Sequence, residues 1–203
     1  HNLAFADGDL IEKLKSRPMT REDKKSGTRV TVWPNPKYFD SPTISQQELQ
    51  RLLRSKAVLL PGVKVSLANA KTGDVQSWQY DQGLRGYLLE SLAQSTSADP
   101  LIPLFEGEQY AGADAEGFAE GEGAAWVVAW TEEGNVVRES YVNLIPTSAG
   151  GTHESGLRDG LFSAVKSFVE MHSLLPKGVK LLPEDVFSRV SFVLSAKVLC
   201  LLY

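Results

Sequence analysis

Few residues of this chain combine a reactive side chain with a spacing that favours chemistry. The best candidates are His153 and Glu154, which directly follow the glycine pair Gly150 and Gly151. A histidine beside a carboxylate can transfer protons. No nucleophile or second carboxylate is fixed nearby by spacing, so hydrogen bonding that holds the loop is favoured over catalysis. We therefore predict no catalytic residue in this chain.

Phosphate-binding and metal-binding patterns are also missing from the sequence. The glycine pair is not a phosphate loop, because the GxxxxGK[ST] pattern is absent and no lysine follows it. His153 and His172 are separated by 172 − 153 = 19 positions, which fits no metal-ligand spacing, and Cys200 is the only cysteine. We predict no metal site.

The elements on either side of the glycine pair are the clearest in the chain. Residues 136–144 alternate apolar with polar side chains, which predicts a half-buried strand. After the pair, apolar residues recur at helical spacing from Leu157 to Met171. Thr152 is expected to cap this helix, and Glu154 complements the positive end of its dipole. Gly150, Gly151, Thr152 and His153 are thus predicted to structure the loop.

Arg158 does not fit this amphipathic pattern. It lies on the flank of the apolar stripe, and its charge opposes the dipole of the first turns. Two explanations stay open. The side chain either covers apolar surface with its stem, or it contacts an anion.

The remaining elements predict a mixed α+β chain. Strands are expected at 2–5, 27–34, 63–67, 75–80, 101–105, 124–130 and 189–199. One helix is expected to start at the capping box of Ser45 and Glu48, a second to span residues 84–94, and a third to start at Pro183. Residues 63–80 are predicted to form a hairpin, and the glycine-rich acidic stretch 107–123 an exposed loop. The Ser, Thr and Pro content of 95–103 indicates a linker.

Charge is unevenly distributed along the chain. Residues 1–97 carry 14 basic and 10 acidic side chains, a balance of +4, whereas residues 98–203 carry 7 and 15, a balance of −8. An acidic chain can contact nucleic acid only through local basic positions. No apolar run approaches the roughly 20 residues of a membrane span, and the single cysteine favours a reducing cytoplasm.

The segments 143–146, 150–153 and 156–158 resemble the B subunits of bacterial type IIA DNA topoisomerases, the gyrase and topoisomerase IV family. Residues 141–147 and 177–181 are more similar to the topoisomerase IV subunits than to the gyrase subunits. The resemblance covers nearly the whole chain, from Asn2 to Leu199. The tail Cys200–Tyr203 matches nothing in the family pattern.

The resemblance implies a fold of two parts. Residues 1–97 are expected to be the C-terminal part of a GHKL-type ATPase α/β sandwich. Residues 98–203 are expected to be a transducer domain with the ribosomal-protein-like second-domain βαβ fold, truncated before the Gln-Thr-Lys loop of the family. Exposed apolar surface is expected on the first part, which should be the less stable one.

The resemblance also implies a function: ATP-coupled strand passage that decatenates and relaxes DNA. Thr28 and Val30 match residues beside and beneath the adenine, and Arg158 matches an arginine that lines the cavity for the transported duplex. ATP and Mg²⁺ are expected cofactors of the full-length enzyme. The base, the magnesium ligand and the lid of the family fall before His1, and the phosphate-sensing lysine after Tyr203, so this piece alone is expected to bind no cofactor and to be inactive.

The partners implied by the resemblance are DNA, the A subunit of topoisomerase IV and a second copy of this chain's own subunit, paired through the ATPase domains. The family implies no membrane and a place in the bacterial cytoplasm at the nucleoid. Three alternatives remain open: a gyrase B fragment, a standalone interaction module that shares the transducer fold, and an unrelated small enzyme.

Overall fold

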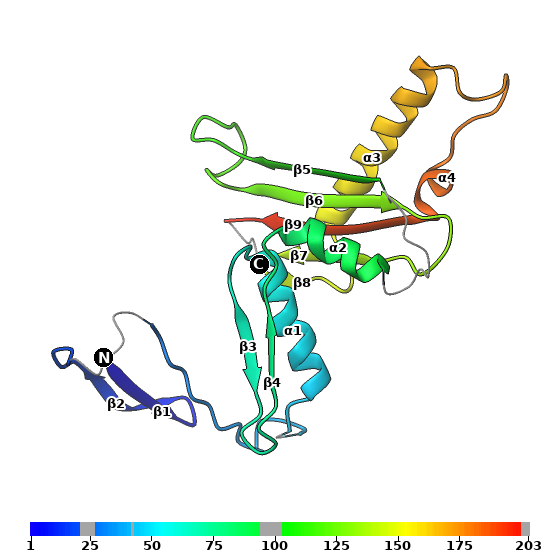
Figure 1. The fold of residues 1–203 in the computed structure, drawn as a ribbon. Coiled ribbons are helices and arrows are strands. Elements are labelled where there is room, and N and C mark those ends of the chain that lie inside the picture. Colours follow the sequence, from blue (N-terminus) through cyan, green and yellow to red (C-terminus); the bar gives the residue numbers. More distant parts are fainter. Residues whose placement is uncertain (21–26, 42, 94–102, 200–203) are drawn as a thin grey trace. The chain divides into compact units, whose positions relative to one another are not determined.

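The computed structural model of the protein describes residues 1–20, 27–41, 43–93 and 103–199. The chain divides into two compact units, His1–Ile44 and Ser45–Tyr203. The domain boundary expected between residues 97 and 98 lies outside the described residues. Figure 1 shows the elements of both units.

The first unit begins with a hairpin of β1 (Asn2–Ala6) and β2 (Asp9–Lys15). Ala6 pairs with Asp9, so Asp7 and Gly8 form a two-residue turn with φ of 51° and 92°. An Asp-Gly pair suits such a turn because both central residues need positive φ. The predicted strand and turn at the start of the chain are confirmed, and every residue of β2 is exposed.

The strand predicted at 27–34 is wrong, because the structure has no strand there. Val30 is 79% exposed and Trp33 is 84% exposed. A strand is stabilised by paired neighbours and by burial of one face. The described residues of this unit supply neither to the segment, so its alternating pattern is not expressed as a strand.

The second unit begins with α1 (Gln46–Leu59), β3 (Val65–Ala68) and β4 (Val75–Trp78). The side chain of Ser45 accepts a hydrogen bond from the amide of Glu48 at 3.4 Å, so the predicted helix start is confirmed. The two strands pair antiparallel, from Val65 with Trp78 to Ala68 with Val75, which confirms the predicted hairpin.

A five-stranded sheet forms the core of the second unit. Its strands are β5 (Leu104–Tyr110), β6 (Gly123–Trp130), β7 (Arg138–Val142), β8 (Ile145–Pro146) and β9 (Val190–Lys197), in the order β5-β6-β9-β7-β8. Strands β7 and β9 are parallel, and the other pairs are antiparallel. The central strand β9 is buried along both faces from Val190 to Leu194.

Helices cover both faces of this sheet (Figure 1). Helix α2 (Gly83–Ala93) packs Leu88 and Leu92 against Val127 and Val193 on one face. On the other face, α3 (Thr152–Met171) and α4 (Pro183–Phe187) cover Val128, Phe192 and Leu194. The parallel strands β7 and β9 are connected through α3 and α4, which makes a βαβ unit.

The expected loop at 107–123 is partly wrong. Residues 107–110 belong to β5, and only residues 111–122 connect it to β6. A side-chain carbon on Gly107 would lie 2.7 Å from the ring of Trp126, its cross-strand partner. The glycine that suggested a loop therefore makes room for an indole inside the sheet.

Candidate functional site

The candidate site is the loop that connects β8 to α3, together with the first turns of that helix. Gly150 has a φ of 71°, and its amide donates to the carbonyl of Thr147 at 2.8 Å. A side-chain carbon on Gly151 would lie 2.9 Å from Nδ1 of His153. The loop thus needs glycine at 150 for the backbone conformation and at 151 for the close approach of the imidazole.

The capping role expected for Thr152 is wrong by one residue. Gly151 is the N-cap of α3 and has no side chain, and Thr152 is the first helical residue. The carbonyl of Gly151 accepts hydrogen bonds from the amides of Glu154 and Ser155, each at 3.1 Å. A side-chain carbon at the cap position would require the imidazole of His153 to move, so glycine suits this position.

Polar side chains tie this loop to strand β7. His153 Nε2 lies 3.0 Å from Thr147 Oγ1, which lies 2.8 Å from Oγ of the buried Ser140. Ser140 Oγ also donates to Glu154 Oε2 at 3.4 Å. The bonds of His153 and Glu154 therefore fix the loop and the first turn of α3 against the sheet.

Arg158 lies one turn further along α3 and is exposed. Its guanidinium carbon is 4.8 Å from the ring centroid of Phe187 in α4, a cation–π contact. No ion pair joins it to Glu154 or Asp159 among the described residues. The guanidinium thus covers an aromatic ring while its N–H donors have no protein acceptor in the described part of the chain.

Thr28 and Val30 lie in the first unit, and the loop residues lie in the second. Both side chains are exposed, and neither belongs to a helix or strand. No group of three His, Cys, Asp or Glu side chains suited to a metal ion occurs within the described ranges.

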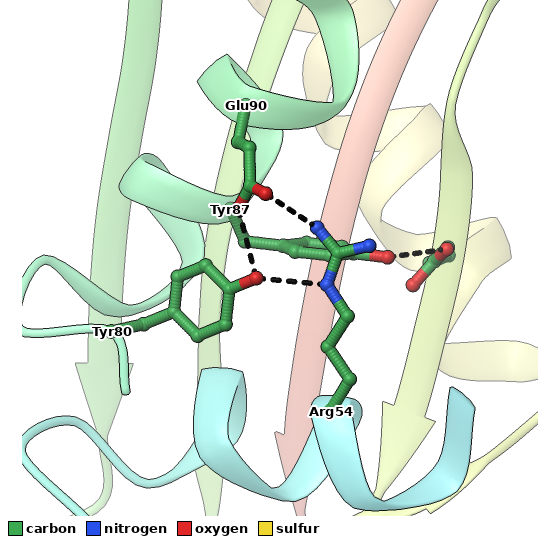
Figure 2. A network of polar contacts seen from close by, with 5 residues as sticks. Arg54, Tyr80, Tyr87 and Glu90 are labelled. Carbon is green, nitrogen blue, oxygen red and sulfur yellow. Dashed lines mark hydrogen bonds and ion pairs between the residues drawn. The ribbon is translucent and has the colours of Figure 1, made fainter. Parts of the chain in front are cut away.

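A second polar cluster, which the sequence did not indicate, joins α1 to α2 (Figure 2). Arg54 Nε donates to the phenol oxygen of Tyr80 at 2.8 Å, and that phenol donates to Glu90 at 2.8 Å. Arg54 Nη2 also lies 3.1 Å from Glu90, an ion pair outside hydrogen-bond geometry. The guanidinium carbon is 5.1 Å from the ring centroid of Tyr87. The arginine is thus held by a carboxylate, a phenol and an aromatic face.

The same cluster extends from α2 to β7 through a shared carboxylate. The phenol of Tyr87 donates to Glu139 at 2.9 Å, and the phenol of Tyr141 donates to the other oxygen of Glu139. Burial and the adjacent carboxylate raise the pKa of Tyr87 to about 12. Burial and the same carboxylate also raise the pKa of Tyr141. Both phenols therefore remain protonated donors at neutral pH.

A cavity of about 530 Å³ opens beside this cluster. Side chains from α1, β4, α2 and β7 line it, among them Gln47, Arg51, Arg54, Trp78, Tyr87 and Tyr141. Burial alone would lower the pKa of Arg54, but the hydrogen bond to Tyr80 and the charge of Glu90 raise it above its ordinary value. Arg54 is thus a fixed cation at the wall of this cavity.

Known proteins resemble this chain along almost its full length. The DNA gyrase B family matches residues 83–199, which is more than half of the chain. The chain is 43% identical over 198 residues to the B subunit of DNA topoisomerase 4 from Pseudomonas aeruginosa and 38% identical over 200 residues to that from Escherichia coli. Each alignment covers 97% of this chain and 30% of the relative, so the chain spans about a third of the length of these relatives.

Solved structures agree with these sequence relatives. The topoisomerase IV ATP-binding domain of Francisella tularensis has a TM-score of 0.64 and 30% identity, covering 84% of this chain and 43% of that one. The 43K ATPase domain of Thermus thermophilus gyrase B has a TM-score of 0.71 at 22% identity, covering 99% and 52%, and supports the fold alone.

The strand, glycine loop and helix described above lie within residues 83–199, the part of the chain that matches the DNA gyrase B family. The chain is a member of the DNA gyrase B family. None of the helices in the described ranges combines the length and hydropathy that crossing a membrane requires.

Proposed function

We propose that this chain is part of the B subunit of a topoisomerase IV, which uses ATP hydrolysis to pass one DNA duplex through another. The observation that carries this proposal is the 43% identity to the B subunit of a DNA topoisomerase 4 along 97% of the chain. Gyrase is the second candidate, because the matching family is named for gyrase B. The topoisomerase IV structure is 30% identical to this chain and the Thermus thermophilus gyrase B structure only 22%, which favours topoisomerase IV.

In the whole protein, ATP and Mg²⁺ would supply the hydrolysis that drives strand passage. Thr28 and Val30 are proposed to contribute an adenine-side wall, since a hydroxyl and an apolar side chain suit the edge and face of a base. One wall buries too little of a nucleotide for useful affinity. We infer that the 203-residue chain alone hydrolyses no ATP.

The partners that we propose for the whole protein are DNA, the A subunit of topoisomerase IV and a second B subunit paired through the ATPase domains. The relatives are named as B subunits, which supports an assembly of unlike subunits. A role on the chromosome implies a place in the bacterial cytoplasm at the nucleoid. We also propose that residues 1–97 and 98–203 correspond to the ATPase part and the transducer part.

Arg158 is proposed to contact the phosphates of the transported duplex. Its exposed N–H donors lie near the start of α3, where helix amides and the dipole favour anions. The contact with Phe187 holds the guanidinium without neutralising its charge. Nothing in this arrangement reads a base, so the contact is expected to be independent of sequence and sensitive to salt.

The test uses a chimera in which this chain replaces the matching segment of the Pseudomonas aeruginosa protein, assembled with the A subunit of the same enzyme. Arg158→Gln is expected to keep basal ATP hydrolysis and to lower DNA-stimulated hydrolysis about tenfold, as expected for one charged hydrogen bond. The salt slope of DNA binding should fall by about one. Lys166→Gln is the matched control, because Lys166 lies on the same helix and already faces Glu170 at 3.9 Å.

Two outcomes would contradict this assignment. If Arg158→Gln loses stability and basal hydrolysis together while DNA stimulation is unchanged, the arginine is structural. If the unsubstituted chimera shows no DNA-stimulated hydrolysis, the proposed function itself fails. The 203-residue chain serves as the blank, and ATP turnover by it that Thr28→Ala abolishes would refute the expected inactivity.

A further inference from the structure

The turn between β7 and β8 has an unfavourable backbone conformation. Val142 pairs with Ile145, so Asn143 and Leu144 form a two-residue turn, with φ of 49° and 68°. Asparagine tolerates the left-handed region, but leucine adopts it only against a steric penalty from its side chain. Contacts elsewhere in the protein must therefore hold Leu144 in this conformation.

Different parts of the unit hold the two turn residues. The side chain of Asn143 donates to the carbonyl of Val198 at 2.7 Å and accepts from its amide at 3.0 Å. The backbone of Leu144 is held from the other direction, because its carbonyl accepts a hydrogen bond from the ammonium of Lys56 in α1. The lysine is partly buried and has no carboxylate partner among the described residues.

From this turn, a short path through the residues of β8 and the hydrogen bonds of Thr147 leads to α3. Two residues of β8 separate Leu144 from Thr147. The amide of Thr147 donates to Ser140, and its hydroxyl contacts His153, one residue into the helix. Thr147 thus connects the turn to the glycine loop and to the first turn of α3.

We propose that Lys56 is a positioning residue: it holds the strained turn at Asn143 and Leu144, and through that turn it sets the glycine loop and the start of α3. Helix α1 directly follows the unit that contains Thr28 and Val30, and it contacts the β3–β4 hairpin. Through the hydrogen bond of Lys56 to Leu144, a shift of α1 would change the position of the loop that precedes Arg158. The consequence for DNA rests on the proposed function, whereas the local effect does not.

The local effect is tested by hydrogen exchange in the 203-residue chain. Lys56→Met keeps the aliphatic stem and removes the donor, and amides in residues 143–153 are expected to exchange roughly tenfold faster. Exchange in α2 and β9 should stay unchanged. Lys56→Arg should restore protection, because a guanidinium also donates to a carbonyl. Lys64→Met is the control, since Lys64 is exposed and has no described polar partner.

A second substitution keeps the test decisive if Lys56→Met alters the whole unit. Glycine adopts positive φ without strain, so Leu144→Gly removes the need for the contact. In the Leu144→Gly background, Lys56→Met should change exchange in 143–153 less than twofold. Equal effects of Lys56→Met in both backgrounds, or a uniform rise across the second unit, would overturn the proposal.

The functional consequence is measured in the chimera described above. Lys56→Met is expected to lower DNA-stimulated hydrolysis and to leave basal hydrolysis unchanged, with recovery in Lys56→Arg. If the unsubstituted chimera responds to DNA and Lys56→Met responds equally, the positioning role is wrong and the proposed function stands. If the unsubstituted chimera does not respond to DNA, only the proposed function fails, and the exchange data still decide the role of Lys56.

Discussion

At the scale of single residues, the shared carboxylate of Glu139 links α2 to the sheet of the second unit. It accepts hydrogen bonds from Tyr87 in α2 and from Tyr141 in its own strand. Both phenols must be protonated to donate, and both pKa values are raised. The folded state therefore binds protons more tightly than the unfolded state in alkaline solution.

This linkage predicts the pH dependence of stability. The pKa of Tyr87 is about 12 in the folded state against an ordinary value of 10.0. Its contribution is complete below pH 10 and is lost as the pH rises from 10 towards 12. Tyr87→Phe should therefore flatten the alkaline decline in the free energy of unfolding, measured by urea titration at several pH values.

The control for this measurement is Tyr38→Phe, because Tyr38 is exposed in the first unit. It should leave the alkaline profile of the second unit unchanged. A wild-type profile that declines no more steeply than that of Tyr87→Phe would show that the Tyr87–Glu139 bond does not contribute to this dependence.

Residue-level prediction from the sequence succeeded where the signal was local. The glycine pair indicated a loop before a helix, and both glycines are needed there. The predicted cap was one residue too late, because the capping preferences of residue types take no account of the close approach of His153 to Gly151. The Arg54 cluster escaped prediction because its partners are distant in sequence, with Arg54 and Tyr80 26 positions apart and Tyr87 and Glu139 52 apart.

At the scale of elements, helices were predicted better than isolated strands. A helix satisfies its own backbone and needs only one apolar stripe, so α1, α2 and α3 could be found from local patterns. A strand needs a partner, and the segment at 27–34 has none among the described residues. Its alternation alone could not predict whether it would pair.

The two helix starts lead to contrasting expectations. Ser45 caps α1 through its side chain, whereas Thr152 is inside the first turn of α3 and caps nothing. Ser45→Ala should lower the free energy of unfolding of the second unit by about 1 kcal/mol, and Ser45→Asp should retain it. Thr152→Ala should change it by less than about 0.5 kcal/mol.

Thermal and urea unfolding of the three variants, followed by circular dichroism, measure this contrast. Thr152→Ala is the matched comparison, because the local pattern predicts the same capping role for both residues. A loss in Thr152→Ala as large as that in Ser45→Ala would mean that Thr152 caps α3 in solution.

At the scale of the whole molecule, α2 packs the first part of the second unit against its sheet. Leu88 and Leu92 are fully buried and pack against Val127 and Val193 of the sheet. Residues 45–93 thereby belong to the same compact unit as the sheet, while residues 1–44 form the other. The boundary expected at 97 and 98 from the family resemblance stays a prediction about the whole protein.

This division predicts how cooperative units exchange with solvent. Amides of α2 should be as protected as those of β6 and β9, whereas residues 27–41, which form no helix or strand, should exchange at nearly unprotected rates.

Leu88→Ala leaves a cavity at a fully buried site, which costs about 2–5 kcal/mol. It should therefore raise exchange in α2, β6 and β9 together and leave residues 1–20 unchanged. Val30→Ala is the control, because Val30 is exposed. If α2 exchanges with residues 27–41 rather than with the sheet, the cooperative boundary lies after α2, where the family resemblance expects it.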